Sequence, residues 1–146
     1  MIVRRLGLAQ EGTFASPAYL EGHGVPRSLE ELQGHEMIGF ASSRTGQTLP
    51  LEFTVEGELR TVMLPCRITV TNTDTYANLA RLGFGLMQAP RYRYAEDLAA
   101  GTLVEVLHEH PPSPTPISVL YPKSRQLSPR VRVFIDWLVE VVAPKL

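Results

Sequence analysis

Short apolar stretches alternate with glycine, proline and polar clusters along the chain, and this pattern divides it into strands and helices. Alternating or continuous apolar runs of roughly four to eight residues are typical of strands, whereas apolar residues at helical spacing indicate helices. Strands are predicted at 2–8, 12–15, 36–40, 49–55, 59–64, 67–70, 86–90, 103–107 and 117–121. Helices are predicted at 16–20, 28–32, 72–82, 91–98 and from 128 onward. The strands on either side of 56–58 form a predicted β-hairpin.

Residues that can cap a helix precede several of the predicted helices. Ser16 and Ser128 are each followed directly by proline, which is favoured at the first helical position. Ser28 is followed by Glu31, the spacing of a capping box. In the last helix the apolar residues at helical spacing are Val131, Phe134, Ile135, Leu138 and Val142.

The segment from Thr71 to Pro90 is the most informative part of the chain. Its polar run 71–75 supplies side-chain oxygens for the free N–H groups of a helix start, and Gly83 and Gly85 permit a tight turn into the next strand. A helix N-terminus that opens at a strand end suits an anionic or carbonyl ligand. The segment therefore favours a ligand-sensing module over an enzyme.

Strands alternate with helices over the whole chain, and one hairpin is inserted. This order predicts an α/β fold with a mixed sheet. Four prolines between 111 and 116 predict an extended connector before the last strand.

Composition limits the class of protein. The 146 residues, 44% hydrophobic and 20% charged with a net charge of −1, suit one globular core without the basic face of a nucleic-acid binder. Cys66 is the only cysteine, so no intramolecular disulfide or cysteine-rich metal site is expected. No apolar run reaches the length of a membrane span, and the first residues lack the apolar region of a signal peptide.

No catalytic motif is present. The sequence has no Gly-x-Ser-x-Gly elbow and no phosphate loop, and Gly83–Gly85 lacks the third glycine of a dinucleotide site. His108 and His110 could share one side of a strand end, but no third ligand accompanies them. Neither a catalytic residue nor a metal or cofactor is therefore predicted.

Several short motifs, in a fixed order, carry a family resemblance. The first group is Ala15–Leu20, Gly24–Pro26 and Leu29–Leu32, ending at His35. The second group is Asn72–Asp74, Gly83–Leu86, Ala89–Pro90, Asp97–Leu98, Gly101–Leu103, Leu120–Pro122 and Leu127–Arg132. Together they resemble the effector-binding domain of LysR-type transcriptional regulators over nearly the whole chain.

The resemblance implies a two-lobed fold like that of type 2 periplasmic binding proteins, with an effector between the lobes. Residues 1–146 would form a partial effector-binding domain, truncated at its N-terminal side. About 14–117 would be the second lobe, and 1–13 and 118–146 would be remnants of an incomplete first lobe, including the C-terminal strand and helix. The family's DNA-binding helix-turn-helix is absent from this sequence.

The resemblance also indicates five candidate effector-binding residues. Ser16, Asn72 and Thr73 are helix caps or first-turn residues that the family pattern brings to the cleft between the lobes. Gln88 lies at a strand end that flanks the effector in the family, although an exposed strand-end glutamine would look the same. Phe40 is either a core aromatic or part of the cleft wall.

The function predicted from these observations is a small-molecule effector-sensing domain of a LysR-type transcriptional regulator. The effector would stabilise one arrangement of the lobes and of the oligomer, in the cytoplasm of a bacterium. A fragment of a solute-binding protein of a transporter is the alternative, and a small hydrolase or transferase is a third for which no residues are found.

Partners follow from the same interpretation. A small-molecule effector is expected in the full-length protein, and DNA would be bound only through the missing N-terminal domain, with no membrane partner. Self-association is also expected, because the apolar face of the last helix and the strand 2–6 would lose their neighbours with most of the first lobe absent.

Overall fold

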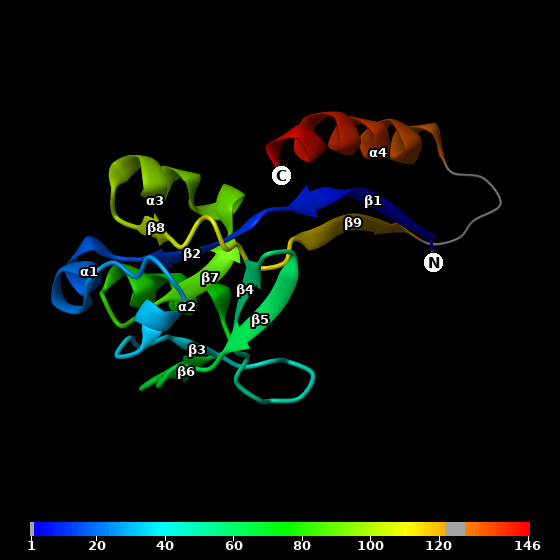
Figure 1. Ribbon diagram of the computed structural model, residues 1–146. Coiled ribbons are helices and arrows are strands. Elements are labelled where there is room, and N and C mark those ends of the chain that lie inside the picture. Colours follow the sequence, from blue (N-terminus) through cyan, green and yellow to red (C-terminus); the bar gives the residue numbers. More distant parts are fainter. Residues whose placement is uncertain (1, 122–127) are drawn as a thin grey trace.

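The computed structural model describes residues 2–121 and 128–146, which form a body and a limb (Figure 1). We define the limb as β1 (Ile2–Ala9), β9 (Thr115–Tyr121) and α4 (Pro129–Val142), with the short η3 (Ala143–Lys145) after α4. The body comprises the elements from β2 to β8. Two of the motif residues named above, Pro122 and Leu127, lie outside the described residues.

The sheet of the body is mixed, as predicted. Its central strand β2 (Glu11–Ala15) lies between β7 (Met87–Pro90) and β8 (Val104–Val106) and is antiparallel to both. A parallel bridge between Met37 and Leu86 connects β7 to β3 (Gly39–Phe40), which pairs in parallel with β6 (Thr69–Val70). The strands β3, β6, β7 and β8 therefore run in one direction and β2 runs in the other.

This strand direction gives the sheet two different edges. The carboxyl ends of β3, β6, β7 and β8 meet at the edge where β2 begins and the limb is attached, which we call the limb edge. The opposite edge, where β2 ends, is the far edge. Loops at the carboxyl ends of parallel strands are the usual place for ligands in α/β proteins.

Three helices and a hairpin surround the sheet (Figure 1). The helices are α1 (Pro17–His23), α2 (Thr73–Arg81) and α3 (Ala95–Ala100), with 3-10 turns η1 (Glu30–Leu32) and η2 (Arg91–Tyr94). The hairpin consists of β4 (Leu51–Val55) and β5 (Glu58–Val62). Its turn is shorter than predicted because Glu56 and Gly57, with φ of 51° and 80°, form the two-residue left-handed turn that matches strand twist.

Three of the four predicted helix caps are confirmed. The Ser16 Oγ accepts from the Tyr19 N–H at 3.1 Å, and Ser128 caps α4 in the same way. The Asn72 Oδ1 accepts from two backbone N–H groups at the start of α2. The capping box at Ser28 is wrong: the segment forms one 3-10 turn, and the Glu31 carboxylate accepts from the Arg27 N–H instead.

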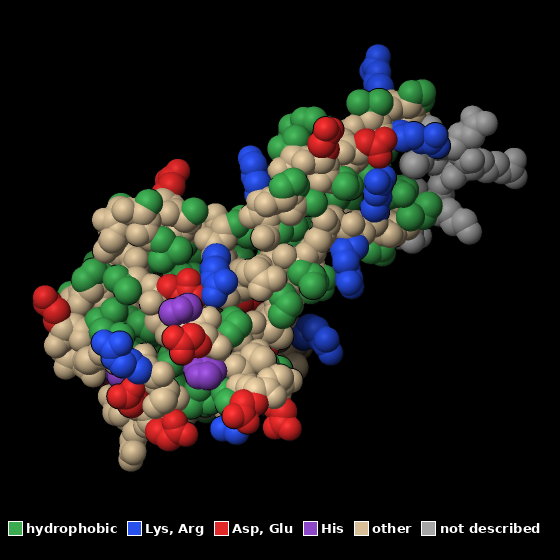
Figure 2. All heavy atoms as spheres, turned by 45° about the horizontal axis from the view of Figure 1, so that its top comes forward, with side chains coloured by type: hydrophobic (Ala, Val, Ile, Leu, Met, Phe, Trp, Pro, Cys, Tyr) green, Lys and Arg blue, Asp and Glu red, His purple; other side chains and the backbone are tan. Residues whose placement is uncertain are grey.

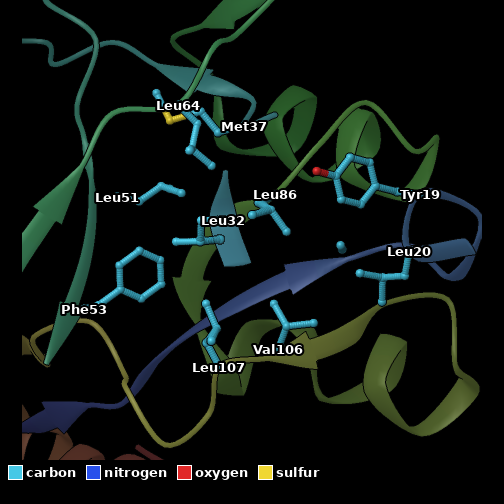
Figure 3. Close-up of a cluster of buried hydrophobic side chains, with 11 residues drawn as sticks. Tyr19, Leu20, Leu32, Met37, Leu51, Phe53, Leu64, Leu86, Val106 and Leu107 are labelled. Carbon is cyan, nitrogen blue, oxygen red and sulfur yellow. The ribbon is translucent and has the colours of Figure 1, made fainter. Parts of the chain in front are cut away.

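Two clusters of buried apolar side chains form the core of the body. One lies between β2, β8, α1 and the hairpin and includes Phe53, Leu86 and Val106 (Figure 3). The other lies under α2 and includes Phe14, Tyr76 and Met87. Each strand contributes alternate residues, as the pleat requires. Because both faces of the sheet are covered, its polar chemistry is confined to the edges.

The limb is an antiparallel ribbon with a helix against it. β1 and β9 pair from Ile2 opposite Tyr121 to Ala9 opposite Thr115, and α4 packs on β1 with Ile135 fully buried. The predicted apolar face of α4 is divided: Leu138 and Val142 are half-buried near Ile135, whereas Val131 and Phe134 are exposed. Successive helical positions are about 100° apart, so Phe134 points away from the face that contains Ile135.

Candidate functional site

Four of the five predicted site residues lie at the limb edge. Phe40 ends β3, and Asn72 and Thr73 begin α2 directly after β6. Gln88 lies on β7, opposite Thr13 of β2. The common direction of β3, β6 and β7 brings these residues to one edge although they are far apart in the sequence.

Gln88 fixes the hairpin to the sheet through every polar atom of its side chain. Its Nε2 donates to the Thr13 Oγ1 at 3.0 Å and to the Glu52 carbonyl oxygen at 2.8 Å, and its Oε1 accepts from the Glu52 N–H at 2.8 Å. The amide is thus fully satisfied and held in one orientation. Gln88 is not a free strand-end glutamine.

Tyr76 forms the floor of the limb edge, and the sequence interpretation missed it. It is 7% exposed, and its ring meets that of Phe40 edge to face with centroids 5.0 Å apart. The Gln88 N–H donates to its hydroxyl oxygen at 2.9 Å. Burial raises the pKa of Tyr76 to about 12, so the hydroxyl keeps its proton at neutral pH. Its position on the buried face of α2, beside Ala77 and Ala80, resembled an ordinary core position.

A pocket of about 180 Å³ opens at the limb edge between the sheet, the hairpin and the start of the limb. It is lined by Glu11, Ile38, Leu49, Pro50, Leu51, Glu52, Tyr76, Gln88, Pro112, Ser113 and Thr115. Of the predicted residues, only Gln88 is part of this lining. Phe40 is not among the lining residues, but its ring packs against that of Tyr76, which is.

Two carboxylates, Glu11 and Glu52, give the pocket its charge. The Thr115 hydroxyl donates to the Glu11 Oε2 at 3.2 Å, and the Ser113 hydroxyl donates to the Glu52 Oε1 at 2.7 Å. Burial raises the pKa of Glu11 above its ordinary value, the bond from Thr115 opposes this, and the nearby charge of Glu52 adds to it. Nothing in the sequence marked these residues, since they come together only through the tertiary fold.

Asn72 and Thr73 form the exposed start of α2, the helix that contributes Tyr76 to this pocket. The Asn72 side chain is occupied by capping, with its Oδ1 2.9 Å from the Asp74 N. Thr73 is exposed and begins a helix of nine residues. The positive end of the α2 dipole is therefore at the limb edge.

Ser16 is not part of this group, and the expectation that it faces the same cleft as Asn72 is wrong. It follows the last residue of β2 and lies at the far edge, 2% exposed. A Cβ at Gly83, beyond the C-terminal end of α2, would lie 3.4 Å from the Ser16 Oγ. Ser16 and Asn72 are thus at opposite ends of α2, because β2 runs against the other strands.

The histidines do not form a metal site among residues 2–121 and 128–146, where no group of three or more metal-binding side chains occurs. The ring of His110 instead contacts the Thr54 carbonyl oxygen at 3.2 Å. At the far edge, the Tyr19 hydroxyl lies 2.8 Å from the His35 Nδ1 and accepts from the Glu36 N–H. Burial lowers the pKa of His35, with His23 adding to the effect.

The described helices include none that is long and apolar enough to cross a membrane.

The mixed sheet and the strand pair that crosses into the limb are those of an α/β domain of the type 2 periplasmic-binding-protein-like class. Residues 1–143 match the LysR substrate binding domain family. The chain belongs to this family, which confirms the predicted fold and the resemblance in the sequence.

The relatives of known sequence are transcriptional regulators. The uncharacterized HTH-type transcriptional regulator YhjC of Escherichia coli is 32% identical over 97% of this chain and 48% of its own length. The HTH-type transcriptional regulator CrgA of Neisseria meningitidis is 29% identical over 90% of this chain and 44% of its own. The chain therefore spans about half the length of the curated relatives it matches. Neither relative supports the transporter alternative.

Solved structures agree with these relatives. The regulatory domain of CrgA from Neisseria meningitidis superimposes with a TM-score of 0.77 at 28% identity, covering 95% of this chain and 67% of that one. The full-length virulence activator AphB of Vibrio cholerae, a LysR-type regulator, gives 0.78 at 27% identity, covering 96% and 47%.

Proposed function

We propose that this chain is the effector-sensing part of a LysR-type transcriptional regulator that acts in the bacterial cytoplasm. The single observation that carries the proposal is the polar pocket at the limb edge, in a chain whose relatives are regulators. In this proposal a small molecule binds at the limb edge, and DNA is contacted by the helix-turn-helix for which the relatives are named. Catalysis has no role in it.

The limb and the body correspond to two lobes in this proposal. The body supplies the second lobe, about 14–117 in the sequence interpretation, and the limb supplies remnants of the first lobe, 1–13 and 118–146 in that interpretation. With the observed element bounds, both junctions between limb and body fall slightly earlier in the sequence than in that interpretation, because β2 begins at Glu11 and β9 begins at Thr115. The two chain crossings at this junction are the natural hinge between the lobes.

The proposed effector site combines the pocket with its surroundings at the limb edge. Thr73 at the start of α2 offers a hydroxyl, Phe40 supports Tyr76, and Gln88 holds the hairpin in place. Ser16, at the far edge, has a structural role in capping α1 and is not part of the proposed effector site.

Effector binding would change the relation between body and limb. Glu11 is the second residue after the limb strand β1, and Thr115 begins the limb strand β9, so the pocket is built partly from both crossings. A ligand that contacts these residues stabilises one hinge arrangement over others, and an oligomer can pass that preference to DNA-binding segments.

A promoter reporter tests this function in cells. The intact gene that encodes this chain is placed with its own upstream promoter, and candidate small molecules are screened for a change in transcription. A dose-dependent response that is lost on substitution of Thr73, with the regulator still present at normal levels, is the expected result. Transcription that responds to no small molecule and does not depend on the regulator would contradict the proposal.

A further inference from the structure

We propose that the pocket at the limb edge selects a small organic cation that also carries an oxygen acceptor, such as an amino alcohol. The inference rests on the proposed function, because it names the chemical class of effector for that site. It follows from two carboxylates and one buried hydroxyl that line the same cavity.

The first observation is an uncompensated pair of carboxylates. Glu11 and Glu52 both line the pocket, and none of the ion pairs among the described residues includes either of them. No lysine or arginine is among the lining residues. Two like charges that share a partly buried site repel each other, and a cation between them removes that repulsion.

The second observation is the hydroxyl of Tyr76. This side chain is more than nine-tenths buried and lines the pocket, and its oxygen accepts from the Gln88 N–H. Among the hydrogen bonds of the described residues, none has the Tyr76 hydroxyl as a donor, so its proton is available to a ligand. A buried hydroxyl without an acceptor carries a desolvation cost that an oxygen on the ligand would remove.

The size of the cavity sets the size of the ligand. A volume of about 180 Å³ is smaller than the roughly 300–1,000 Å³ of pockets for drug-sized molecules. A molecule with a few heavy atoms, an ammonium group and one hydroxyl therefore matches both the charge and the space.

The same contacts connect the ligand to the hinge. The hydroxyls that hold the two carboxylates belong to Ser113 and Thr115, at the segment that leads into β9. A cation that draws Glu11 and Glu52 together would act on these two bonds. The limb strand is thus tied to the charged groups that the ligand contacts.

Three molecules with one skeleton test the charge preference. We would titrate the isotopically labelled 146-residue chain at neutral pH and fixed ionic strength with 3-aminopropanol, 1,3-propanediol or 3-hydroxypropanoate, and follow backbone amide shifts. Saturable shifts at Glu11, Glu52 and Gln88 with the amine alone are the expected result. Saturable binding of the hydroxy acid at these positions, or no saturable shift with the amine, overturns the inference.

Substitutions assign the effect to particular groups. Glu11→Gln and Glu52→Gln keep the shape of the side chain and should each weaken amine binding by about tenfold. Glu58→Gln removes an exposed carboxylate on the outer hairpin strand and should leave binding unchanged. Tyr76→Phe should abolish the preference for 3-aminopropanol over propylamine, which lacks the oxygen. Denaturation curves establish that each variant is folded, and unchanged binding in the two pocket variants contradicts the inference.

The promoter reporter separates this inference from the proposed function. If the intact regulator responds to an anionic effector through the same pocket, the charge inference is wrong and the proposed function stands. If the amine binds the pocket but transcription never depends on the regulator, the proposed function fails and the binding preference stands.

Discussion

Ser16 and Asn72 both cap helices, yet they lie at opposite ends of α2. Asn72 starts that helix at the limb edge, whereas Ser16 lies against Gly83 just beyond its C-terminal end. The separation has one cause: β2, which leads to Ser16, runs antiparallel to β3, β6, β7 and β8, so its carboxyl end emerges at the far edge. Two caps with the same local chemistry therefore have different relations to the ligand site.

The effector response should distinguish these two caps. In the intact regulator, Thr73→Val is expected to shift the dose response of the promoter reporter without lowering stability, because Thr73 is exposed at the limb edge. Ser16→Ala should lower the free energy of unfolding by about 1 kcal/mol through loss of the cap, and leave the midpoint of the response unchanged. An equal shift of the midpoint in both variants would mean that the far edge also takes part in sensing.

Gln88→Ala should destabilise the body. It removes three hydrogen bonds that join β7 to the hairpin and to β2, and it leaves the backbone groups of Glu52 without partners. The expected loss is about 2 kcal/mol in urea denaturation of the isolated chain. Gln33→Ala, at an exposed glutamine, is the control and should change stability by less than about 0.5 kcal/mol. Equal stability of the two variants would contradict the bracing role of Gln88.

Stability should decrease in mild acid because of His35. Its pKa is lowered in the folded protein by burial and by the nearby His23, so the unfolded chain takes up the proton more readily than the folded one. The contribution of neutral His35 to the free energy of unfolding is fully present above the ordinary pKa of 6.5. It decreases as the pH falls through that value toward the pKa in the folded protein.

Denaturation midpoints at several pH values measure this effect. His35→Gln should reduce the pH dependence between neutral pH and pH values below 6.5, while His108→Gln, at an exposed position, should preserve it. An unchanged pH profile in the His35 variant would assign the acid sensitivity to other groups.

Asp97 should cause a second loss of stability, at lower pH than His35. Arg81 donates to both of its carboxylate oxygens at 2.8 Å, which lowers the pKa of Asp97 to about 2. The resulting stabilisation is present above the ordinary pKa of 3.8 and is lost as the pH falls toward 2. Because Arg81 is 37% exposed, solvent screening limits the expected cost of Asp97→Asn to about 1 kcal/mol at pH 7. Denaturation of the variant and the parent at pH 7 and near pH 2 checks this, since their free energies of unfolding should become equal near pH 2.

The isolated chain should self-associate through the outer face of α4. Val133, Phe134 and Trp137 are 67%, 55% and 52% exposed there, beside an open hollow that they line with Pro129 and Arg130. Figure 2 shows apolar side chains at the surface of the limb among its Lys and Arg residues. A second copy can cover such a face around a two-fold axis.

Light scattering over a range of concentrations measures this association. The parent mass should rise with concentration, and the double change Phe134→Ser with Trp137→Ser should give a constant monomer mass. Leu82→Ser removes a similarly exposed apolar residue from the body, where Leu82 is 71% exposed, and should leave association unchanged. A parent chain that stays monomeric at all concentrations would rule this surface out.

The local features of the chain were predictable because they depend on neighbours in the sequence. Caps at Ser16, Asn72 and Ser128 involve atoms within about three residues, so the sequence alone indicated them. The alternation of strands and helices and the hairpin followed from apolar periodicity, and the family followed from motif order. The box at Ser28 failed because its segment is too short for an α-helix and closes as a single 3-10 turn.

The site itself was decided by contacts between distant parts of the chain. Gln88 and Glu52 are 36 positions apart, and Thr115 and Glu11 are 104 apart, yet each pair is hydrogen-bonded at the limb edge. No periodicity encodes such a pairing, because the direction and register of β2 among its neighbours determine which side chains share an edge. The sequence by itself thus determined the elements, the fold class and the family. Only the tertiary structure brought Glu11, Glu52 and Tyr76 into one pocket and moved Ser16 away from it.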